Sequence, residues 1–498
     1  MEQGSAVTVG WKCCGKRTEC PQKHNMYVVF TAITGTTADC PQTGRSKVTT
    51  PRQDRFMRRF LARTVETVPD TLKHVLDQET FTKARLYQLD KSSFGFWHGL
   101  YSQFETTLIL VFGGFPFVWW YAGEVTGRFG YGPDYEILQS LSFLFITSIF
   151  STVTSLPWTV YSTFVLEEKH GFNKQTPGFF VKDQIKKFIV MQCISLPVVS
   201  GLIYIIQIGG DYFFIYTWIF TFVVSLLLIT IYADYIAPLF DKFTPLPEGD
   251  LRTRIEALAA SIDFPLTKLF VVEGSKRSAH SNAYFYGFFK NKRIVLFDTL
   301  IEDYKPPGEE EKDKKSEEEE DNSHKDSVDP AEAQETKTEE KDEKQKQQGC
   351  TNDEILAVLG HELGHWKLSH NLKNLVISQV NTFLCFMIFA FLIKKTVLYT
   401  AFGFDTRPIL IGMLIIFQFI FSPYHEVLSF CMTVLSRKFE FEADAFAKRM
   451  KKASDLKSSL IKLNKDNLGF PVVDWLYSTW SYSHPPLLER LKALEKTD

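Results

Sequence analysis

The sequence FFIYTWIFTFVVSLLLITIY, residues 213–232, contains no charged side chain in 20 consecutive positions. As an α-helix this segment would be about 30 Å long, which is the thickness of the hydrocarbon core of a bilayer. A helix satisfies its backbone hydrogen bonds within itself, so it is the structure expected in hydrocarbon. The segment therefore predicts a transmembrane helix and an integral membrane protein.

Five further apolar runs are almost free of charge. The first contains Gly113 and Pro116, and the last is interrupted by Pro423 and Glu426, so we expect both to be kinked or only partly exposed to lipid. The alternative, buried helices in a large soluble protein, does not suit so many long runs almost free of charge. We expect a mainly α-helical, polytopic membrane fold with six spans. The five runs are residues 106–122, 137–166, 188–208, 374–393 and 409–435.

The overall composition hides a segregation of charge. The 498 residues carry a formal net charge of −2 and are 45% hydrophobic, values that a soluble protein also shows. Residues 302–348 hold 19 acidic and 9 basic side chains and almost no apolar ones, which predicts a disordered acidic insertion. The rest of the chain carries a net charge of +8, scattered among apolar runs. This distribution argues against a nucleic-acid-binding protein and favours membrane lipid as a partner.

The polar segments divide the chain further. Residues 1 to about 65 contain neither a run long enough to span a bilayer nor a secretory signal peptide. Between the apolar runs 213–232 and 374–393, residues 266–272 and 293–300 predict two strands. The expected organisation is an atypical N-terminal segment (1–75), four membrane helices (76–232), a polar domain with the acidic insertion 302–348 (233–373), a membrane hairpin (374–435) and a C-terminal continuation of the polar domain (436–498).

A metal-binding motif lies just before the apolar run 374–393, where His361-Glu362-Leu-Gly-His365 follows a stretch of helix formers. Side chains four apart lie on about the same face of a helix, so both imidazoles can reach one ion while Glu362 projects beside them. This is the arrangement of a zinc site with an adjacent general base. A catalytic zinc usually has a third protein ligand, and the short motif alone also occurs by chance.

The candidate third ligand lies just after the last apolar run, residues 409–435. Glu440 and Asp444 are four residues apart, and a chain that crosses the membrane twice returns them to the side that holds HExxH. Glu440 is expected to bind the metal, and Asp444 to accept a hydrogen bond from the outer N–H of a ligand histidine. The alternative is a solvated acidic face, which includes Glu442 and pairs with nearby lysines and Arg437.

Two other polar groups are candidates for contact with substrate. His484 precedes two prolines and a helix that carries Arg490, and such a histidine can donate to a developing oxyanion. Asn282 lies in a polar turn before a strand and can donate to a substrate backbone or to the tetrahedral intermediate. Either His484 or Asn282 alone would more often be a structural residue.

HELGH at 361–365, EFEAD at 440–444 and SHPPLLER at 483–490 resemble the integral-membrane zinc CAAX prenyl proteases, whose members process prenylated mating pheromone and prelamin A. Further resemblance lies in LDKS (89–92), EEKHGFN (167–173), ADYIAP (233–238) and EGSKR (273–277). It extends from about residue 76 to near the C-terminus. The family's first transmembrane helix should precede residue 76, and no run in residues 1–65 corresponds to it.

The resemblance implies a seven-helix barrel that encloses a large chamber and is capped by the zinc domain. It implies one Zn²⁺ per chain, prenylated CAAX substrates of the prelamin A type, and the endoplasmic reticulum and inner nuclear membrane as the location. The implied roles are zinc ligand for His361, His365 and Glu440, general base for Glu362, outer partner for Asp444, and substrate contact for His484, Asn282 and Arg490.

Three rival functions remain open from the sequence. An intramembrane-cleaving metalloprotease would carry HExxH within a span, whereas here both halves of the site flank the hairpin. A membrane quality-control zinc peptidase without prenyl specificity would use the same motifs. A catalytically inactive membrane scaffold would carry HExxH without bound metal.

Overall fold

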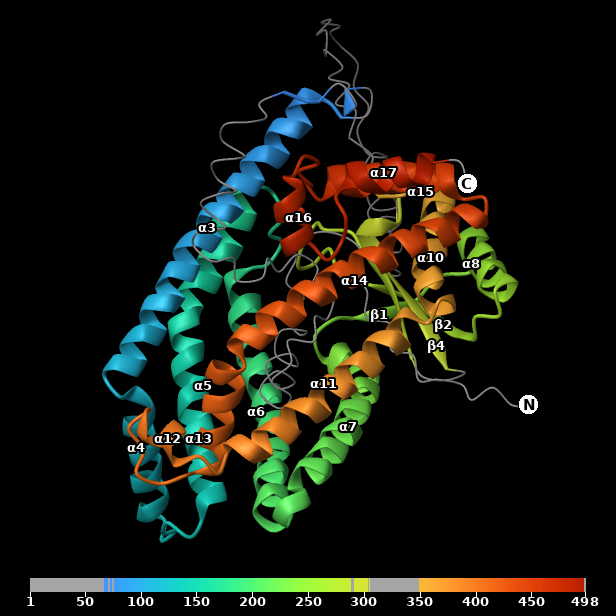
Figure 1. Ribbon diagram of the computed structural model, residues 1–498. Coiled ribbons are helices and arrows are strands. Elements are labelled where there is room, and N and C mark those ends of the chain that lie inside the picture. The colour runs from blue at the N-terminus through green and yellow to red at the C-terminus, as the bar shows by residue number, and fades with distance from the viewer. Residues whose placement is uncertain are drawn as a thin grey trace, which may run out of the picture.

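The computed structural model describes residues 67–496, apart from residues 70–71, 74–75, 288–290, 303 and 305–348. Long helices form one part of the molecule, and a small sheet with shorter helices forms another (Figure 1). The mainly α-helical membrane fold expected from the sequence is confirmed. Most of the N-terminal segment and most of the acidic insertion lie outside the described residues.

Four helices are long and apolar enough to cross a bilayer by themselves. Large apolar side chains such as Val223 and Leu227 are exposed on one face, where lipid solvates them. On the other face of the run 213–232, Thr217, Thr221 and Ser225 are buried. Each of their hydroxyls donates to the backbone carbonyl four residues earlier. Small buried residues at this spacing let helices approach closely in a membrane. The four are α5 (Glu136–Tyr161, continued as a π-helix over Ser162–Glu167), α6 (Pro177–Ile208), α7 (Phe213–Ile231) and α11 (His370–Leu392).

Two further spans are bent, as expected for the first and last apolar runs. The first pair meets at 66°, where Gly113 adopts φ +64°, a conformation that favours glycine. The run 106–122 therefore covers the break and is not one straight span. The second pair meets at 57°, with Pro423 in the first turn of its second helix. The pairs are α3 (Gln78–Val111) with α4 (Gly114–Arg128), and α13 (Ile409–Leu414, continued over Ile415–Ile420) with α14 (Ser422–Arg449).

The sheet of the polar part has four strands in the order β1-β2-β4-β3, with β2 parallel to β4 and the other pairs antiparallel. The strand expected at 266–272 is confirmed. The strand expected at 293–300 starts one residue earlier and ends at Phe297, because Asp298–Leu300 form a 3-10 turn. The short strands β1 and β3 were not expected. The strands are β1 (Phe243–Pro245), β2 (Leu266–Val272), β3 (Ala283–Tyr286) and β4 (Lys292–Phe297).

One face of this sheet packs on the helix that carries HELGH. Val271, Ile294 and Leu296 of the sheet lie in one buried cluster with Leu359 and Leu363 of that helix. Burial on the sheet fixes the helix, and a capping box at its start, formed by Thr351 and Glu354, satisfies its first backbone N–H groups. The helices of this part are α8 (Asp250–Ser261), α10 (Asn352–Lys367), α15 (Ala453–Asp466), α16 (Trp475–Ser481) and α17 (Leu487–Glu495).

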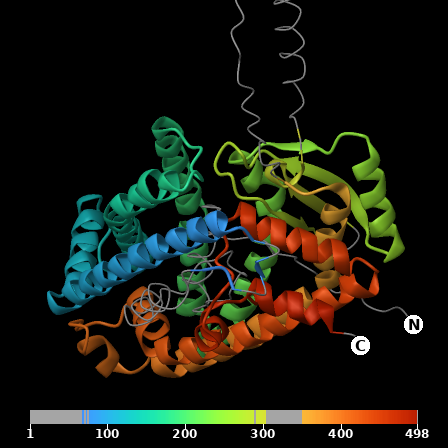
Figure 2. The ribbon, with the colours of Figure 1, turned by 90° about the horizontal axis from the view of Figure 1, so that it is seen from above.

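Helix α14 joins the two parts of the molecule. It begins at the bend of the last span and continues without interruption past α10 (Figure 1). In the view from above, the sheet and the C-terminal helices lie on one side and the teal helices α4 and α5 on the other (Figure 2). Arg437 of α14 binds Glu489 of α17 and the carbonyl of Ser478 in α16, which positions both C-terminal helices against it. The end of a membrane span is thus a structural element of the polar part.

Candidate active site

The two histidines of HELGH face the same point. His361 and His365 are buried on α10, and their Nε2 atoms lie 3.2 Å apart. Two acceptor nitrogens this close repel each other unless a proton or a cation lies between them. The helix therefore presents a pair of imidazoles suited to bind a cation.

Glu440 of α14 completes a set of three donor atoms. Its Oε2 lies 3.4 Å from Nε2 of His361, and its Oε1 lies 3.4 Å from Nε2 of His365. Tetrahedral ligands at a zinc–ligand distance of 2.0–2.1 Å are separated by about 3.4 Å, so two nitrogens and one oxygen at these spacings fit the ion. Within the described part of the chain, no other group of three His, Cys, Asp or Glu side chains has metal-binding geometry.

A close helix–helix contact brings the two halves of this set together. A Cβ at Gly364 of α10 would lie 3.1 Å from Cβ of Phe446 and 3.3 Å from Cα of Ala443, both on α14. Ala443 and Ala447 are fully buried at this crossing. Because these side chains are absent or small, α14 approaches closely enough for Glu440 to reach both histidines.

Asp444 and Arg490 hold the outer side of His361. Oδ1 of Asp444 lies 2.8 Å from Nδ1 of His361, and Arg490 donates to both carboxylate oxygens over 2.8 and 2.5 Å. Burial would raise the pKa of Asp444, but the charge of Arg490, and then of His361, lowers it below its usual value. The carboxylate thus stays ionised and accepts the Nδ1–H of His361, which leaves Nε2 of that ring free to bind a metal.

The other predicted residues lie around this set. Nδ1 of His484 lies 3.0 Å from Oε2 of Glu440, and its Nε2 is buried without a hydrogen-bond partner among the described residues. Glu362 is buried beside His361 in the sequence of α10. Asn282 immediately precedes β3, and its Oδ1 accepts from the backbone N–H of Ala283. The structure thus brings His361, His365, Glu440, Asp444, His484 and Arg490 together, whereas Asn282 hydrogen-bonds to the backbone at the start of β3.

The loop that carries Asn282 is held by a polar cluster between the membrane helices and the polar part. Two residues earlier, His280 stacks on Phe172 at 3.9 Å and contacts Asn467 through Nδ1 at 2.7 Å. Its Nε2 lies 3.8 Å from Glu167, which accepts a hydrogen bond from Tyr87 of α3 at 2.8 Å. Lys91 of LDKS lies 3.3 Å from Glu167 of EEKHGFN, so both stretches lie beside this cluster.

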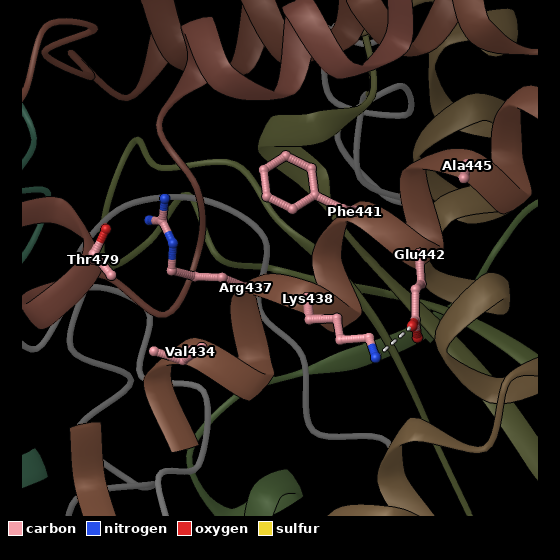
Figure 3. Close-up of a pocket in the computed structure, with 7 residues that line it drawn as sticks. All are labelled: Val434, Arg437, Lys438, Phe441, Glu442, Ala445 and Thr479. Atoms are coloured by element: carbon pink, nitrogen blue, oxygen red, sulfur yellow. Dashed lines mark ion pairs between the residues drawn. The ribbon is translucent and has the colours of Figure 1, made fainter. Parts of the chain in front are cut away.

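Glu440 and Asp444 of α14 do not belong to a solvated face. Glu440 and Asp444 are 0% and 1% exposed, which excludes that alternative for both. Glu442 is partly exposed, lies 3.8 Å from Lys438 and lines a pocket of about 460 Å³ with Phe441 and Thr479 (Figure 3). Its other carboxylate oxygen contacts a histidine that the sequence reasoning missed.

That residue is His370, the first residue of α11. Its Nδ1 lies 2.8 Å from Nδ1 of His365, and its Nε2 lies 2.9 Å from Oε2 of Glu442. The sequence signal was a further histidine five residues after HELGH. Spacing alone does not place this histidine at the site, because its approach depends on Ser369, whose left-handed backbone (φ +56°) redirects the chain between α10 and α11.

Comparison with known families assigns both parts of the chain. Residues 57–242 match the family described as CAAX prenyl protease N-terminal, five membrane helices, and residues 245–498 match peptidase family M48. The two matches meet where the fourth membrane helix gives way to the polar part. The second contains the metal-binding cluster, so this part is a metallopeptidase unit.

Individual relatives agree with this assignment. The chain is 65% identical over 440 residues to the CAAX prenyl protease 1 homolog of Homo sapiens. The aligned region covers 88% of this chain and 90% of the relative. The Saccharomyces cerevisiae CAAX prenyl protease 1 is 36% identical over 447 residues, covering 86% and 88%. The crystal structure of S. mikatae Ste24p superimposes with a TM-score of 0.74 at 33% identity, covering 96% of this chain and all of that one. With both parts matched and the buried His-His-Glu cluster in place, the chain belongs to the CAAX prenyl proteases of peptidase family M48 and is a membrane metalloprotease.

Proposed function

We propose that the chain is a zinc endopeptidase that removes the last three residues of farnesylated CAAX proteins, with a second upstream cleavage in prelamin A-like substrates. The observation that carries the proposal is the buried set of two imidazoles and one carboxylate at mutual distances of 3.2–3.4 Å, directly beside Glu362. Two nitrogens and one oxygen are the donor set of many catalytic zinc sites, which keep a fourth position for water.

The chain's own residues supply the acid–base chemistry. When bound, zinc lowers the pKa of water to about 7 and polarises the scissile carbonyl. Glu362 takes a proton from the attacking water and returns it to the leaving amine. His484 lies against Glu440 through Nδ1, and in the imidazolium form, which carries an N–H on both ring nitrogens, its Nε2–H would donate to the carbonyl oxygen as that atom gains negative charge.

Binding of the substrate backbone is assigned to the free edge of the sheet. In the order β1-β2-β4-β3, strand β3 is an edge strand, and it contacts α10. An extended peptide can pair with such an edge, and Asn282, which immediately precedes β3, offers its side-chain amide as an additional donor at the start of that edge. Arg490 acts by holding Asp444, and through it His361.

The membrane helices are assigned to the lipid part of the substrate. Family membership supports an enclosed chamber between them, in which a prenyl chain would be shielded from water. Residence in the endoplasmic reticulum and inner nuclear membrane belongs to the same proposal, and its support is the resemblance to the family.

The test is cleavage of a farnesylated CAAX peptide by the purified full chain, beside the same peptide without the prenyl group. We expect release of the C-terminal tripeptide from the farnesylated peptide, loss of activity with a chelator, and recovery with Zn²⁺. The matched control is Glu362→Gln, which preserves the ligands and should be inactive. Equal cleavage of both peptides would replace the proposal with a quality-control peptidase, and no bound zinc would support an inactive scaffold.

A further inference from the structure

The two candidate ligand histidines differ in what their Nδ1 atoms contact. Nδ1 of His361 contacts a carboxylate, whereas Nδ1 of His365 contacts another histidine. Nε2 of His365 faces His361 and Glu440, while its Nδ1 faces Nδ1 of His370 at 2.8 Å. Nε2 of His370 in turn faces Glu442 at 2.9 Å. A chain of hydrogen bonds thus leads from the metal-binding cluster to the partly exposed carboxylate of Glu442.

The direction of the protons along this chain follows from its two ends. An ionised carboxylate can only accept, so Nε2 of His370 carries the hydrogen and donates it to Glu442. A neutral imidazole has one N–H, so Nδ1 of His370 is then an acceptor and requires a hydrogen on Nδ1 of His365. That tautomer of His365 leaves a lone pair on Nε2, the atom that faces the metal-binding cluster.

We propose that His370 and Glu442 are positioning residues that fix His365 in its metal-binding tautomer and orientation. The inference rests on the proposed zinc function and deepens it. Glu442 lies two residues from Glu440 and so projects from the other side of α14. Glu442 therefore does not contact His365 directly, and His370, at the start of α11, contacts both side chains.

The surroundings keep His370 in place. Its ring is fully buried and stacks on Phe439 of α14 at a centroid distance of 4.1 Å and an interplanar angle of 7°. The left-handed turn at Ser369 sets its backbone. Glu442 contacts Lys438 at the pocket of Figure 3, so its charge is partly balanced there.

Helix α14 therefore contributes a carboxylate to the outer support of each of the two histidines. Glu440 of α14 is the third donor, Asp444 supports His361 directly, and Glu442 supports His365 through His370. Outer contacts of this kind typically contribute 10–100-fold to metal affinity. The role assigned to His370 is thus measurable without any substrate.

The experiment compares two substitutions of His370 that separate packing from hydrogen bonding. His370→Phe keeps an aromatic ring on Phe439 but removes the acceptor for Nδ1–H of His365. His370→Asn removes the ring but places an amide oxygen close to the former Nδ1 position. Affinity for Zn²⁺ is measured on metal-free full-length protein by competition with a chromophoric chelator.

We expect His370→Phe to weaken zinc binding by roughly 10–100-fold and His370→Asn to recover most of that loss. A merely structural role would give the opposite order, with the phenylalanine variant close to wild type, and that result would overturn the inference. Wild-type protein that fails to bind zinc would instead refute the proposed function itself, so the two failures are distinct.

Glu442 gives a second test at a position that tolerates substitution better, since it is partly exposed. Glu442→Gln keeps an acceptor for Nε2–H of His370, whereas Glu442→Leu does not. We expect zinc affinity in the order wild type, glutamine variant, leucine variant, with the leucine variant weaker by about tenfold. Glu426→Gln, an exposed acid on the same helix, is the control and should stay within about twofold. Equal affinity of the two Glu442 variants would overturn the inference.

Discussion

The crossing of α10 and α14 can be tested with two glycines on the same helix. A Cβ at Gly360 would meet its nearest atoms at 3.8 and 3.9 Å, which is ordinary contact. A Cβ at Gly364 would lie 3.1 Å from Cβ and Cδ1 of Phe446 and 3.3 Å from Cα of Ala443. Gly360→Ala and Gly364→Ala thus add the same methyl group, and only the second forces the helices apart.

The expected magnitudes follow from two opposing effects. Glycine to alanine inside a helix stabilises by about 1 kcal/mol through backbone propensity, and both variants gain this amount. Overpacking costs about 1–3 kcal/mol, because Cβ of Phe446 and Cα of Ala443 move only with the backbone of α14. We expect Gly360→Ala to raise the free energy of unfolding by about 1 kcal/mol and Gly364→Ala to lower it by up to about 2 kcal/mol.

The consequence for the site separates this interpretation from a general loss of stability. A shift of α14 by a few tenths of an ångström carries Glu440 away from both histidines, whereas metal–ligand distances tolerate only about 0.2 Å. Zinc affinity of Gly364→Ala should therefore fall by about tenfold or more, while Gly360→Ala binds as wild type. The assays are thermal unfolding of metal-free protein in detergent and chelator competition. The reasoning is refuted if Gly364→Ala is as stable as Gly360→Ala and binds zinc normally.

Three other changes give distinct outcomes. Glu362→Gln should keep stoichiometric zinc and lose turnover by at least about 100-fold, and a variant that cleaves the farnesylated peptide at the wild-type rate would disprove the assignment of the base. Glu440→Ala should lose more zinc affinity than the roughly 10–100-fold cost of an outer contact, and unchanged metal content on elemental analysis would exclude it as a ligand. Burial lowers the pKa of Lys292 in β4 to about 8 from 10.5, so the unfolded chain binds more protons between these values and stability rises with pH there. Lys292→Met should remove up to about 1.4 kcal/mol per pH unit of that rise, and identical pH profiles of unfolding would contradict it.

The sequence predicted those features that depend on local spacing. HExxH places two candidate ligands one turn apart, and the hairpin between them and Glu440 returns both halves to one side, so the meeting of His361, His365 and Glu440 could be predicted from periodicity and topology. The four spans that are long and apolar enough to cross by themselves could be predicted in the same way, since about 20 apolar residues are needed to cross a bilayer. The kink at Gly113 and the bend near Pro423 were expected from residue type.

Other features depend on tertiary contacts that no local pattern shows. His370 meets His365 because Ser369 adopts a left-handed conformation and the ring of His370, at the start of α11, stacks on Phe439 of α14. Glu442 has the same sequence signature as a solvated acid, and its role depends on the histidine that reaches it. Strands β1 and β3 contain only three and four residues, too short for alternation to be recognised.

The placement of Glu440 on a membrane helix couples the site to the membrane helices. In a metal site built from one compact domain, the ligand distances depend on the core of that domain alone. Here α14 begins at the 57° bend of a transmembrane pair and carries Glu440, Glu442 and Asp444 in its polar half. Any rotation or sliding of this span moves the third donor and both outer anchors together relative to α10. The small residues at the α10–α14 crossing oppose such movement, because a tightly packed contact has no space for gradual displacement. The geometry of the site is thus set at that crossing, where α14 leaves the membrane helices and packs on α10.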